Sequence, residues 1–278
     1  MERFRKTKEE FEEYLNEFAA FESVPLALRE AILYSLVDGG KRIRPVIFLE
    51  TLRAFCGDVC KNAKKFSVAI ESLHIYTLIH DDLPSMDNDD FRRGKPSNHK
   101  KFGEGLAILA GDALLNFAYE LILECIEETK CEKFMRAGRV FSQLLGSNGL
   151  IGGQSLDIEN LSMTDEKLTY IFENKTIALL KVSALCGAIL GGADEKEQEL
   201  ISKFIYHFGF AFQIKDDMIE FFSKKPPSFC DYIAHYGINK AKEDLEKHTK
   251  KALNALEKLK QDTSFLKELT EFAQARDH

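Results

Sequence analysis

Apolar residues recur at helical spacing along almost the whole chain, and runs that alternate apolar with polar side chains are absent. Residues 4–18 and 25–37 both show this spacing, and residues 106–126 are apolar on nearly every face. Six prolines and 17 glycines in 278 residues are too few for a fold rich in strands and turns. The sequence therefore predicts an all-α, single-domain helical bundle of about ten helices over residues 1–278.

Start and stop signals place the boundaries of the other helices. Pro45 suits a helix start, and Thr164, followed by two acidic residues, suits another. Gly39–Gly40 and Gly152–Gly153 are read as stops, and the Pro-Pro pair at 226–227 as a break. The remaining helices are expected at residues 41–55, 63–80, 134–150, 164–191, 195–222 and 231–259.

Composition limits the classes of function. The net charge is −7, and no basic stripe of the kind that binds a nucleic-acid backbone is present. The six cysteines form no CxxC pair, which favours reduced thiols in a cytoplasmic protein. The charged N-terminus lacks a signal core and no run of 18 apolar residues occurs, so neither secretion nor a membrane span is expected.

Two acidic clusters stand next to apolar stretches. In HDDLPSMDNDDFRR, residues 80–93, an unbroken helix would splay Asp81 and Asp87 apart, but Pro84 should bend the chain and return Asp87 toward Asp81. In QIKDDMIE, residues 213–220, Asp216 and Glu220 share one helix face. Such oxygen clusters suit Mg²⁺ bound together with substrate phosphates. The plain alternative is a pair of solvated helix ends.

Basic residues lie close to these clusters in the sequence. GGKRIRP, residues 39–45, concentrates Lys41, Arg42 and Arg44 at a helix start, where anions bind readily. Arg92 and Arg93 directly follow the first acidic cluster. Alone, the first group would be read as a surface patch. Together the two groups predict a site for two phosphorylated ligands, one held through Mg²⁺ and one through Arg and Lys.

These pieces make the chain similar to a known family. GGKRIRP, the long stretch at 72–115, GGQSLDIE at 152–159, Lys175-Thr176 and FQIKDD at 212–217 resemble the trans-isoprenyl diphosphate synthases, and bacterial farnesyl diphosphate synthases most of all. The resemblance implies a helical bundle around a central cavity, a homodimer, and condensation of isopentenyl diphosphate with dimethylallyl or geranyl diphosphate. The expected product is farnesyl diphosphate, C15.

The resemblance also implies roles for individual residues. Three Mg²⁺ ions are expected, held by Asp81, Asp82, Asp87, Asp216 and Asp217. Isopentenyl diphosphate is expected at Lys41, Arg44, His74 and Arg93, and the allylic diphosphate at Arg92, Lys175, Thr176 and Gln213. Asp81, Asp87, Lys175 and Asp216 are the expected catalytic residues. For His74, a histidine that merely packs in the core is the alternative.

Product length is expected to depend on residues just before the first acidic cluster. Tyr76 and Thr77 lie about one helical turn before Asp81, so a chain growing away from the metal would meet them. Bacterial C15 members of the family have an aromatic residue here. We therefore expect the Tyr76 ring to stop growth at C15, unless it serves only as packing.

Two departures from the family pattern stand out. The second acidic motif ends in Glu220 where Asp is usual, and Phe229 takes the place of a lysine in a shortened loop. Lys224 or Lys225 is a candidate replacement for that charge. Three alternatives therefore stay open: the same chemistry with a C10 or C20 product, a non-catalytic regulatory subunit of a prenyl synthase, and a terpene cyclase.

Overall fold

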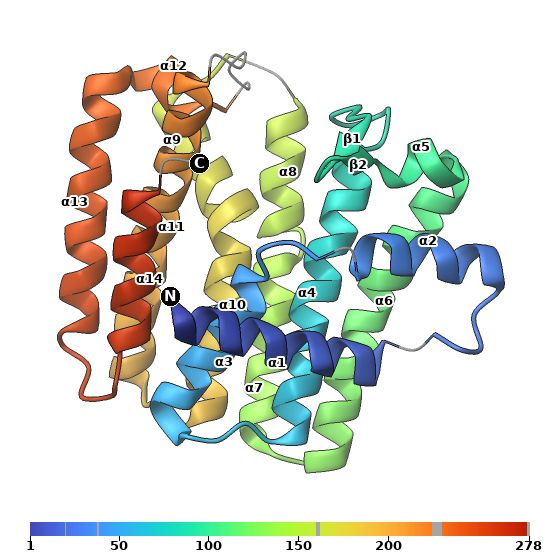
Figure 1. Cartoon of the computed structure of the whole chain (residues 1–278). Coiled ribbons are helices and arrows are strands. Elements are labelled where there is room, and N and C mark those ends of the chain that lie inside the picture. Colours follow the sequence, from blue (N-terminus) through green and yellow to red (C-terminus); the bar gives the residue numbers. More distant parts are fainter. Residues whose placement is uncertain (20, 38, 160–161, 224–229, 277–278) are drawn as a thin grey trace. The chain divides into compact units, whose positions relative to one another are not determined.

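The computed structural model describes residues 1–19, 21–37, 39–159, 162–223 and 230–276, and almost all regular structure in them is helical (Figure 1). The expected all-α class is confirmed. The chain divides into two compact units, which we describe separately. The N-terminal unit comprises Glu2–Leu49 and Val59–Met135, and the C-terminal unit comprises Met1, Glu50–Asp58 and Arg136–His278. The single-domain expectation stays a prediction.

The N-terminal unit is centred on α4, which packs against both α6 and α1 (Figure 1). Most of α4 is buried, because its apolar residues cover more than one face. The Phe48 and Phe66 rings stack inside this unit, with centroids 5.5 Å apart and an interplanar angle of 11°. The elements are α1 (Glu2–Phe18), α2 (Leu26–Leu36), α3 (Ile43–Cys56), α4 (Lys61–Asp81), β1 (Phe91–Arg92), β2 (Lys95–Pro96), α5 (Asn98–Phe102) and α6 (Glu104–Thr129).

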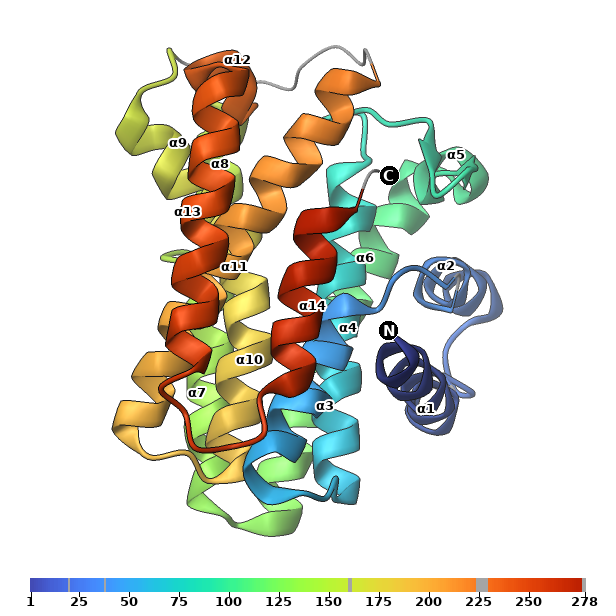
Figure 2. The same cartoon turned by 60° about the vertical axis from the view of Figure 1, so that its left-hand side comes forward.

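In the C-terminal unit, the long helix α11 packs against α10, α13 and α14 (Figure 2). Asp194 begins α11 with a capping box to Glu197, which satisfies backbone donors at the helix start. The unit contains α7 (Glu132–Leu145), α8 (Leu150–Ile158), α9 (Asp165–Ile171), the π-helical turn η1 (Phe172–Ile177), α10 (Ala178–Gly191), α11 (Glu195–Phe222), α12 (Tyr232–Tyr236), α13 (Ile238–Leu256) and α14 (Ser264–Ala275). Helices α3 and α7 each contribute residues to both units.

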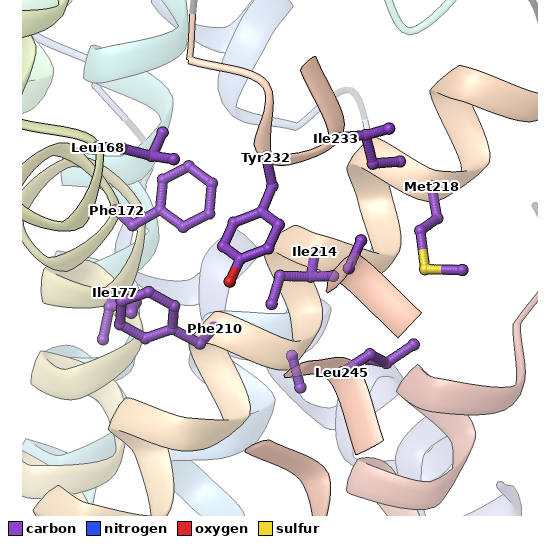
Figure 3. Close-up of a cluster of buried hydrophobic side chains, with 11 residues drawn as sticks. Leu168, Phe172, Ile177, Phe210, Ile214, Met218, Tyr232, Ile233 and Leu245 are labelled. Carbon is purple, nitrogen blue, oxygen red and sulfur yellow. The ribbon is translucent and has the colours of Figure 1, made fainter. Parts of the chain in front are cut away.

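An apolar cluster joins η1, α11 and α12 within the C-terminal unit. Figure 3 shows the Tyr232 ring next to Phe172 and Ile214, and the two ring centroids of Phe172 and Tyr232 are 5.9 Å apart. Phe210 completes the aromatic group, and its ring centroid lies 5.8 Å from that of Phe172. This cluster fixes η1 against α11, and the two elements carry three of the expected ligands of the allylic substrate: Lys175, Thr176 and Gln213.

Several expected boundaries agree with the structure. The helix expected at 195–222 matches α11, and Thr164 caps α9 by accepting from the amide of Lys167. The expected count omitted short helices such as α5 and α12, and α14 was not anticipated. The antiparallel pair β1–β2 was also missed, because strands of two residues are too short to show an alternating apolar and polar pattern.

The helix expected at 134–150 is wrong at its end. α7 stops at Leu145, and Gly152–Gly153 lie inside α8 instead of terminating a helix. A Cβ atom at residue 153 would lie 2.5 Å from the backbone nitrogen of Lys175. Glycine is therefore needed there for close contact between α8 and η1, not as a stop.

Two helical segments have the length and composition of a membrane span, Glu104–Thr129 and Asp165–Gly191. In their most apolar windows, 39% and 67% of the residues are buried inside the fold. Core helices of globular proteins pass the same test, so length and composition give no clear span here.

Candidate active site

The first acidic cluster forms a tight turn at the end of α4. The helix ends at Asp81, because Pro84 has no N–H group and cannot continue it. The backbone amide of Asp87 donates to the carbonyl oxygen of Asp81 at 2.8 Å, and Asn88 has a left-handed φ of 55°. The expected return of Asp87 toward Asp81 is confirmed at the level of the backbone.

The acidic turn fits a divalent cation that arrives with its substrate. Asp81 and Asp87 carry carboxylate oxygens on one turn of backbone, and such oxygens are the ligand type that Mg²⁺ prefers. Within the described ranges, no group of three or more His, Cys, Asp or Glu side chains is arranged to hold a metal ion. Mg²⁺ commonly binds through a few carboxylates plus phosphate oxygens. The pair is therefore suited to a metal whose other ligands come from a diphosphate.

Asp82 is a buried residue of the first acidic cluster, and its carboxylate is paired with Arg92. Its Oδ1 accepts from the Arg92 Nε at 2.8 Å and also from Nη2 of the same guanidinium. Arg92 Nη2 further contacts Asp89 at 3.0 Å. Burial raises the pKa of Asp82, and the guanidinium opposes this shift. Asp82 thus orients Arg92, and its assignment as a metal ligand stays a prediction.

Arg44 and His74, both expected at isopentenyl diphosphate, lie in contact. Arg44 Nη1 is 3.1 Å from His74 Nε2. Burial, then the charges of Arg44 and Arg93, hold the pKa of His74 well below its usual range. The ring is therefore neutral near pH 7. Because a guanidinium only donates, Nε2 accepts from Arg44, and the single N–H of the ring lies on the buried Nδ1 atom. Lys41 is exposed on the loop that precedes α3, the helix that carries Arg44.

Arg42, the middle cation of GGKRIRP, is a buried anchor. It has a left-handed φ of 51° and is 2% exposed. Its guanidinium pairs with Glu12 of α1 and Glu71 of α4, each at 2.8 Å, and donates to the Leu36 carbonyl. The sequence did not separate this role from that of Lys41 and Arg44. The buried pairs fix the loop that carries Lys41 and leads into α3, where Arg44 lies.

Arg93 lies against the two glycines of the same loop. Its Nη1 donates to the Gly39 carbonyl at 3.0 Å, and a Cβ atom at residue 40 would lie 2.6 Å from its Cζ. Gly40 also has a φ of +97°, and this backbone conformation is what requires glycine there, since the end of the Arg93 side chain could shift. Arg92 and Arg93 border a small pocket between α2, the end of α4 and the β1–β2 hairpin. Its other lining residues include Tyr34, Ile75, Asp82 and Asn98.

Tyr76 lies on α4 about one turn before the acidic residues. Its ring meets the His80 ring edge-on, with centroids 5.0 Å apart. Burial, followed by the charges of Asp81 and Asp112, raises the pKa of Tyr76. Thr77 donates its hydroxyl to the His74 carbonyl at 2.8 Å. Both residues have the place along α4 that the chain-length prediction requires.

The C-terminal unit brings two of the expected allylic ligands, Thr176 and Gln213, into contact. Thr176 Oγ1 donates to Gln213 Oε1 at 3.3 Å, and Gln213 Nε2 donates to Asp217 Oδ1 at 2.8 Å. The other Asp217 oxygen accepts from the Tyr232 amide at 2.8 Å. Burial raises the pKa of Asp217 to about 7, against the effect of these bonds. Protein donors thus engage both of its oxygens, and its role as a metal ligand stays a prediction.

Asp216 is more exposed than Asp217 and is paired with a residue near the C-terminus. Arg276 Nη2 contacts Asp216 Oδ1 at 2.8 Å, and the guanidinium lies 3.9 Å from the Phe212 ring centroid. Glu220 follows one turn later on the unbroken helix α11, as expected. No sequence pattern pointed to Arg276, because α14 was not among the expected helices.

The family model for polyprenyl synthetases matches residues 25–276. The chain belongs to this family. The expected kinship with trans-isoprenyl diphosphate synthases is thereby confirmed.

Three members illustrate the similarity within the polyprenyl synthetase family. Farnesyl diphosphate synthase of Geobacillus stearothermophilus is 40% identical over 269 residues, 91% of this chain and 90% of that protein. Farnesyl diphosphate synthase of Bacillus subtilis is 38% identical over 98% of this chain and 96% of its own length. The crystal structure of an FPP/GFPP synthase from Zymomonas mobilis has a TM-score of 0.87 at 30% identity, covering 98% of this chain and 99% of that one.

One departure from the family pattern cannot be placed. Phe229, Lys224 and Lys225 lie outside the described residues.

Asp157 of GGQSLDIE lies among the described residues, and the sequence pattern predicted no role for it. It pairs with Lys175, an expected catalytic residue.

Proposed function

We propose that this chain is a trans-prenyltransferase, a farnesyl diphosphate synthase that condenses isopentenyl diphosphate with dimethylallyl or geranyl diphosphate. The similarity to curated farnesyl diphosphate synthases over nearly the full chain supports the reaction class. The contact of neutral His74 with Arg44 is the observation that best supports a site for isopentenyl diphosphate. The guanidinium donors of Arg44, oriented by His74, and of Arg93, held by the Gly39 carbonyl, suit a diphosphate.

The residues of the chain supply binding and charge stabilisation. Asp81 and Asp87 are proposed for two Mg²⁺ ions and Asp216 for a third, and the metal when bound neutralises charge on the departing diphosphate. Lys175 and Arg92 donate to the allylic diphosphate, and their positive charges stabilise it as its bond to carbon breaks. The carbonyl dipole of Gln213 and the oxygen of Thr176 stabilise the allylic cation. No protein nucleophile is needed.

Product length is assigned to Tyr76. The Zymomonas relative is named for two products, so membership of the family does not fix the chain length. The ring of Tyr76 is held edge-on by His80 on the same helix. A rigid aromatic ring one turn from the acidic residues limits growth to C15. Products of C10 or C20 are the outcomes that would contradict this part.

A homodimer and a cytoplasmic location complete the proposal. Helix α6 leaves Ile108, Leu109 and Leu123 exposed at 43%, 53% and 63%. Large apolar side chains in a row along one helix suit contact with a second copy. All six cysteines are free, which suits a reducing compartment. Sedimentation analysis of the wild type against Leu109→Glu tests the dimer.

One experiment tests the reaction directly. Purified protein is incubated with isopentenyl diphosphate and geranyl diphosphate, with Mg²⁺ or with EDTA, and the products are sized by chromatography. We expect C15 product only with the metal. Absence of any condensation product, in a protein with a cooperative thermal unfolding transition, would contradict the proposed function and favour the regulatory-subunit alternative.

A further inference from the structure

Asp157 joins two side chains from separate segments of the C-terminal unit. Its Oδ2 forms an ion pair with Lys175 Nζ, and its Oδ1 accepts from Cys230 Sγ at 2.7 Å. The Asp157 side chain is 18% exposed and that of Lys175 is 28% exposed. Both carboxylate oxygens have partners, so the orientation of the carboxylate is fixed from two sides.

The backbone explains why Asp157 reaches Lys175. Gly153 lies one turn before Asp157 on α8, and any side chain there would collide with the backbone of η1 at Asn174 and Lys175. The glycine lets α8 lie directly on this π-helical turn. Asp157 then projects from the next turn of α8 over the ammonium group. Single π turns are often found at functional sites.

We propose that Asp157 is a positioning residue that holds Lys175 toward the allylic diphosphate, with the Cys230 thiol fixing Asp157. This inference rests on the proposed function, which places Lys175 at that diphosphate. A lysine ammonium has three N–H donors. Asp157 accepts from one of them and so limits the direction of the ammonium group.

The advantage of this pair is preorganisation. A free lysine side chain loses much rotamer freedom when it binds an anion. In this fold Asp157 has already limited that freedom, so less is lost when substrate arrives. The carboxylate also reduces the local positive charge. The fixed geometry raises the affinity of Lys175 for an anion, whereas the negative charge of Asp157 lowers it. We assign the larger effect to geometry because the lysine is only partly exposed.

A double-mutant cycle in pyrophosphate binding tests the proposal. The dissociation constant of inorganic pyrophosphate, with Mg²⁺ present, is measured by calorimetry for wild type, Asp157→Ala, Lys175→Ala and the double variant. We expect Asp157→Ala to weaken binding about 10-fold in the wild-type background and less than about 2-fold in the Lys175→Ala background. Equal losses in both backgrounds, no loss, or tighter binding would overturn the positioning role.

Steady-state kinetics add a second readout. Asp157→Ala should raise KM for the allylic diphosphate about 10-fold and change KM for isopentenyl diphosphate less than about 2-fold. Asp157→Glu should restore most of the loss, because it keeps the carboxylate. Cys230→Ser keeps a donor and should behave as wild type, whereas Cys230→Ala should show a smaller rise of the same kind. A parallel rise in both KM values would contradict the proposal.

Stability controls separate positioning from folding. Asp165→Asn removes the carboxylate of another ion pair in this unit, with His235, on an exposed side chain. It should leave both binding and kinetics unchanged. If Asp157→Ala lowers the thermal midpoint so far that the protein is unfolded at assay temperature, Asp157→Asn takes its place in the cycle. If wild type makes no prenyl product, the proposed function fails, while the pyrophosphate cycle still decides the Asp157–Lys175 link.

Discussion

The amide of Asp87 donates a hydrogen bond to the carbonyl oxygen of Asp81, six residues earlier and 2.8 Å away. This bond places two carboxylates on one turn that a continuous helix would have separated. The turn is a property of the backbone, so substitution of either side chain should preserve it. The two carboxylates can therefore be tested without loss of the fold.

Asp81→Asn and Asp87→Asn should each reduce product formation on the order of 100-fold and raise the Mg²⁺ concentration needed for half-maximal rate. Each change removes one negative ligand from the proposed metal site. Initial rates over a Mg²⁺ titration check this. Asp90→Asn is the matched control, because Asp90 pairs with Lys100 at the surface and should titrate as wild type does. Unaltered Mg²⁺ dependence in both variants would remove the metal-ligand role.

Tyr76→Ala should extend the product to C20 or beyond. Loss of the ring opens space along α4, whereas the acidic turn that follows is unchanged. Mass spectrometry of the dephosphorylated products gives the chain length. Tyr76→Phe keeps the ring and should still yield C15. A C15 product from Tyr76→Ala would assign this tyrosine to packing alone.

Gly153→Ala should lower the free energy of unfolding by about 1–3 kcal/mol. The new Cβ would meet the backbone of η1 at 2.5 Å, and backbone cannot rotate away as a side chain can. Urea unfolding gives the difference. Gly105→Ala, in helix α6, is the control: no atom lies within 4 Å of the added Cβ, so stability should be unchanged or higher. Similar midpoints for the two variants would show that α8 and η1 can separate without cost.

His207 and His248 should make the protein less stable in mild acid. Their Nδ1 atoms are 3.3 Å apart, and burial, with neighbouring lysines, lowers the pKa of each ring to about 4. An unfolded histidine has a pKa of about 6.5, so the unfolded state binds more protons between the two values. Stability is therefore full above about pH 6.5 and falls as the pH drops toward 4.

Urea unfolding at pH 7.5 and pH 5 measures this effect. We expect a loss of about 2 kcal/mol for each histidine, less where the two titrations are coupled. The charged groups around the pair are Lys203, Lys247, Lys251 and Asp244, and Asp244 acts in the opposite direction on His248. His207→Phe should flatten the pH dependence. An identical slope in wild type and variant would exclude the pair as its source.

Helical period and capping residues were enough to predict most of the fold. The span of α11 and the start of α9 followed from spacing and from Thr164. The prediction that a helix ends at Gly152–Gly153 was wrong, because glycine permits close packing as well as helix termination. Only the position of the neighbouring element η1 shows that packing is its role here. The return of Asp87 was predictable because proline forbids the helical bond. Asp157 and Arg276 were not, since their partners lie 18 and 60 residues away along the chain.

The buried pairs of Arg42 have a consequence for the first helix. The family match begins at residue 25, yet Glu12 of α1 holds Arg42, and Lys8 of α1 donates to the carbonyl of Gly40 at 2.7 Å. The opening segment thus supports the cationic loop from outside the matched region. Trimming the chain to its family boundary would remove Glu12 and leave the buried Arg42 Nε without this acceptor. We therefore expect substrate affinity to fall when α1 is removed, although its residues have no proposed contact with substrate.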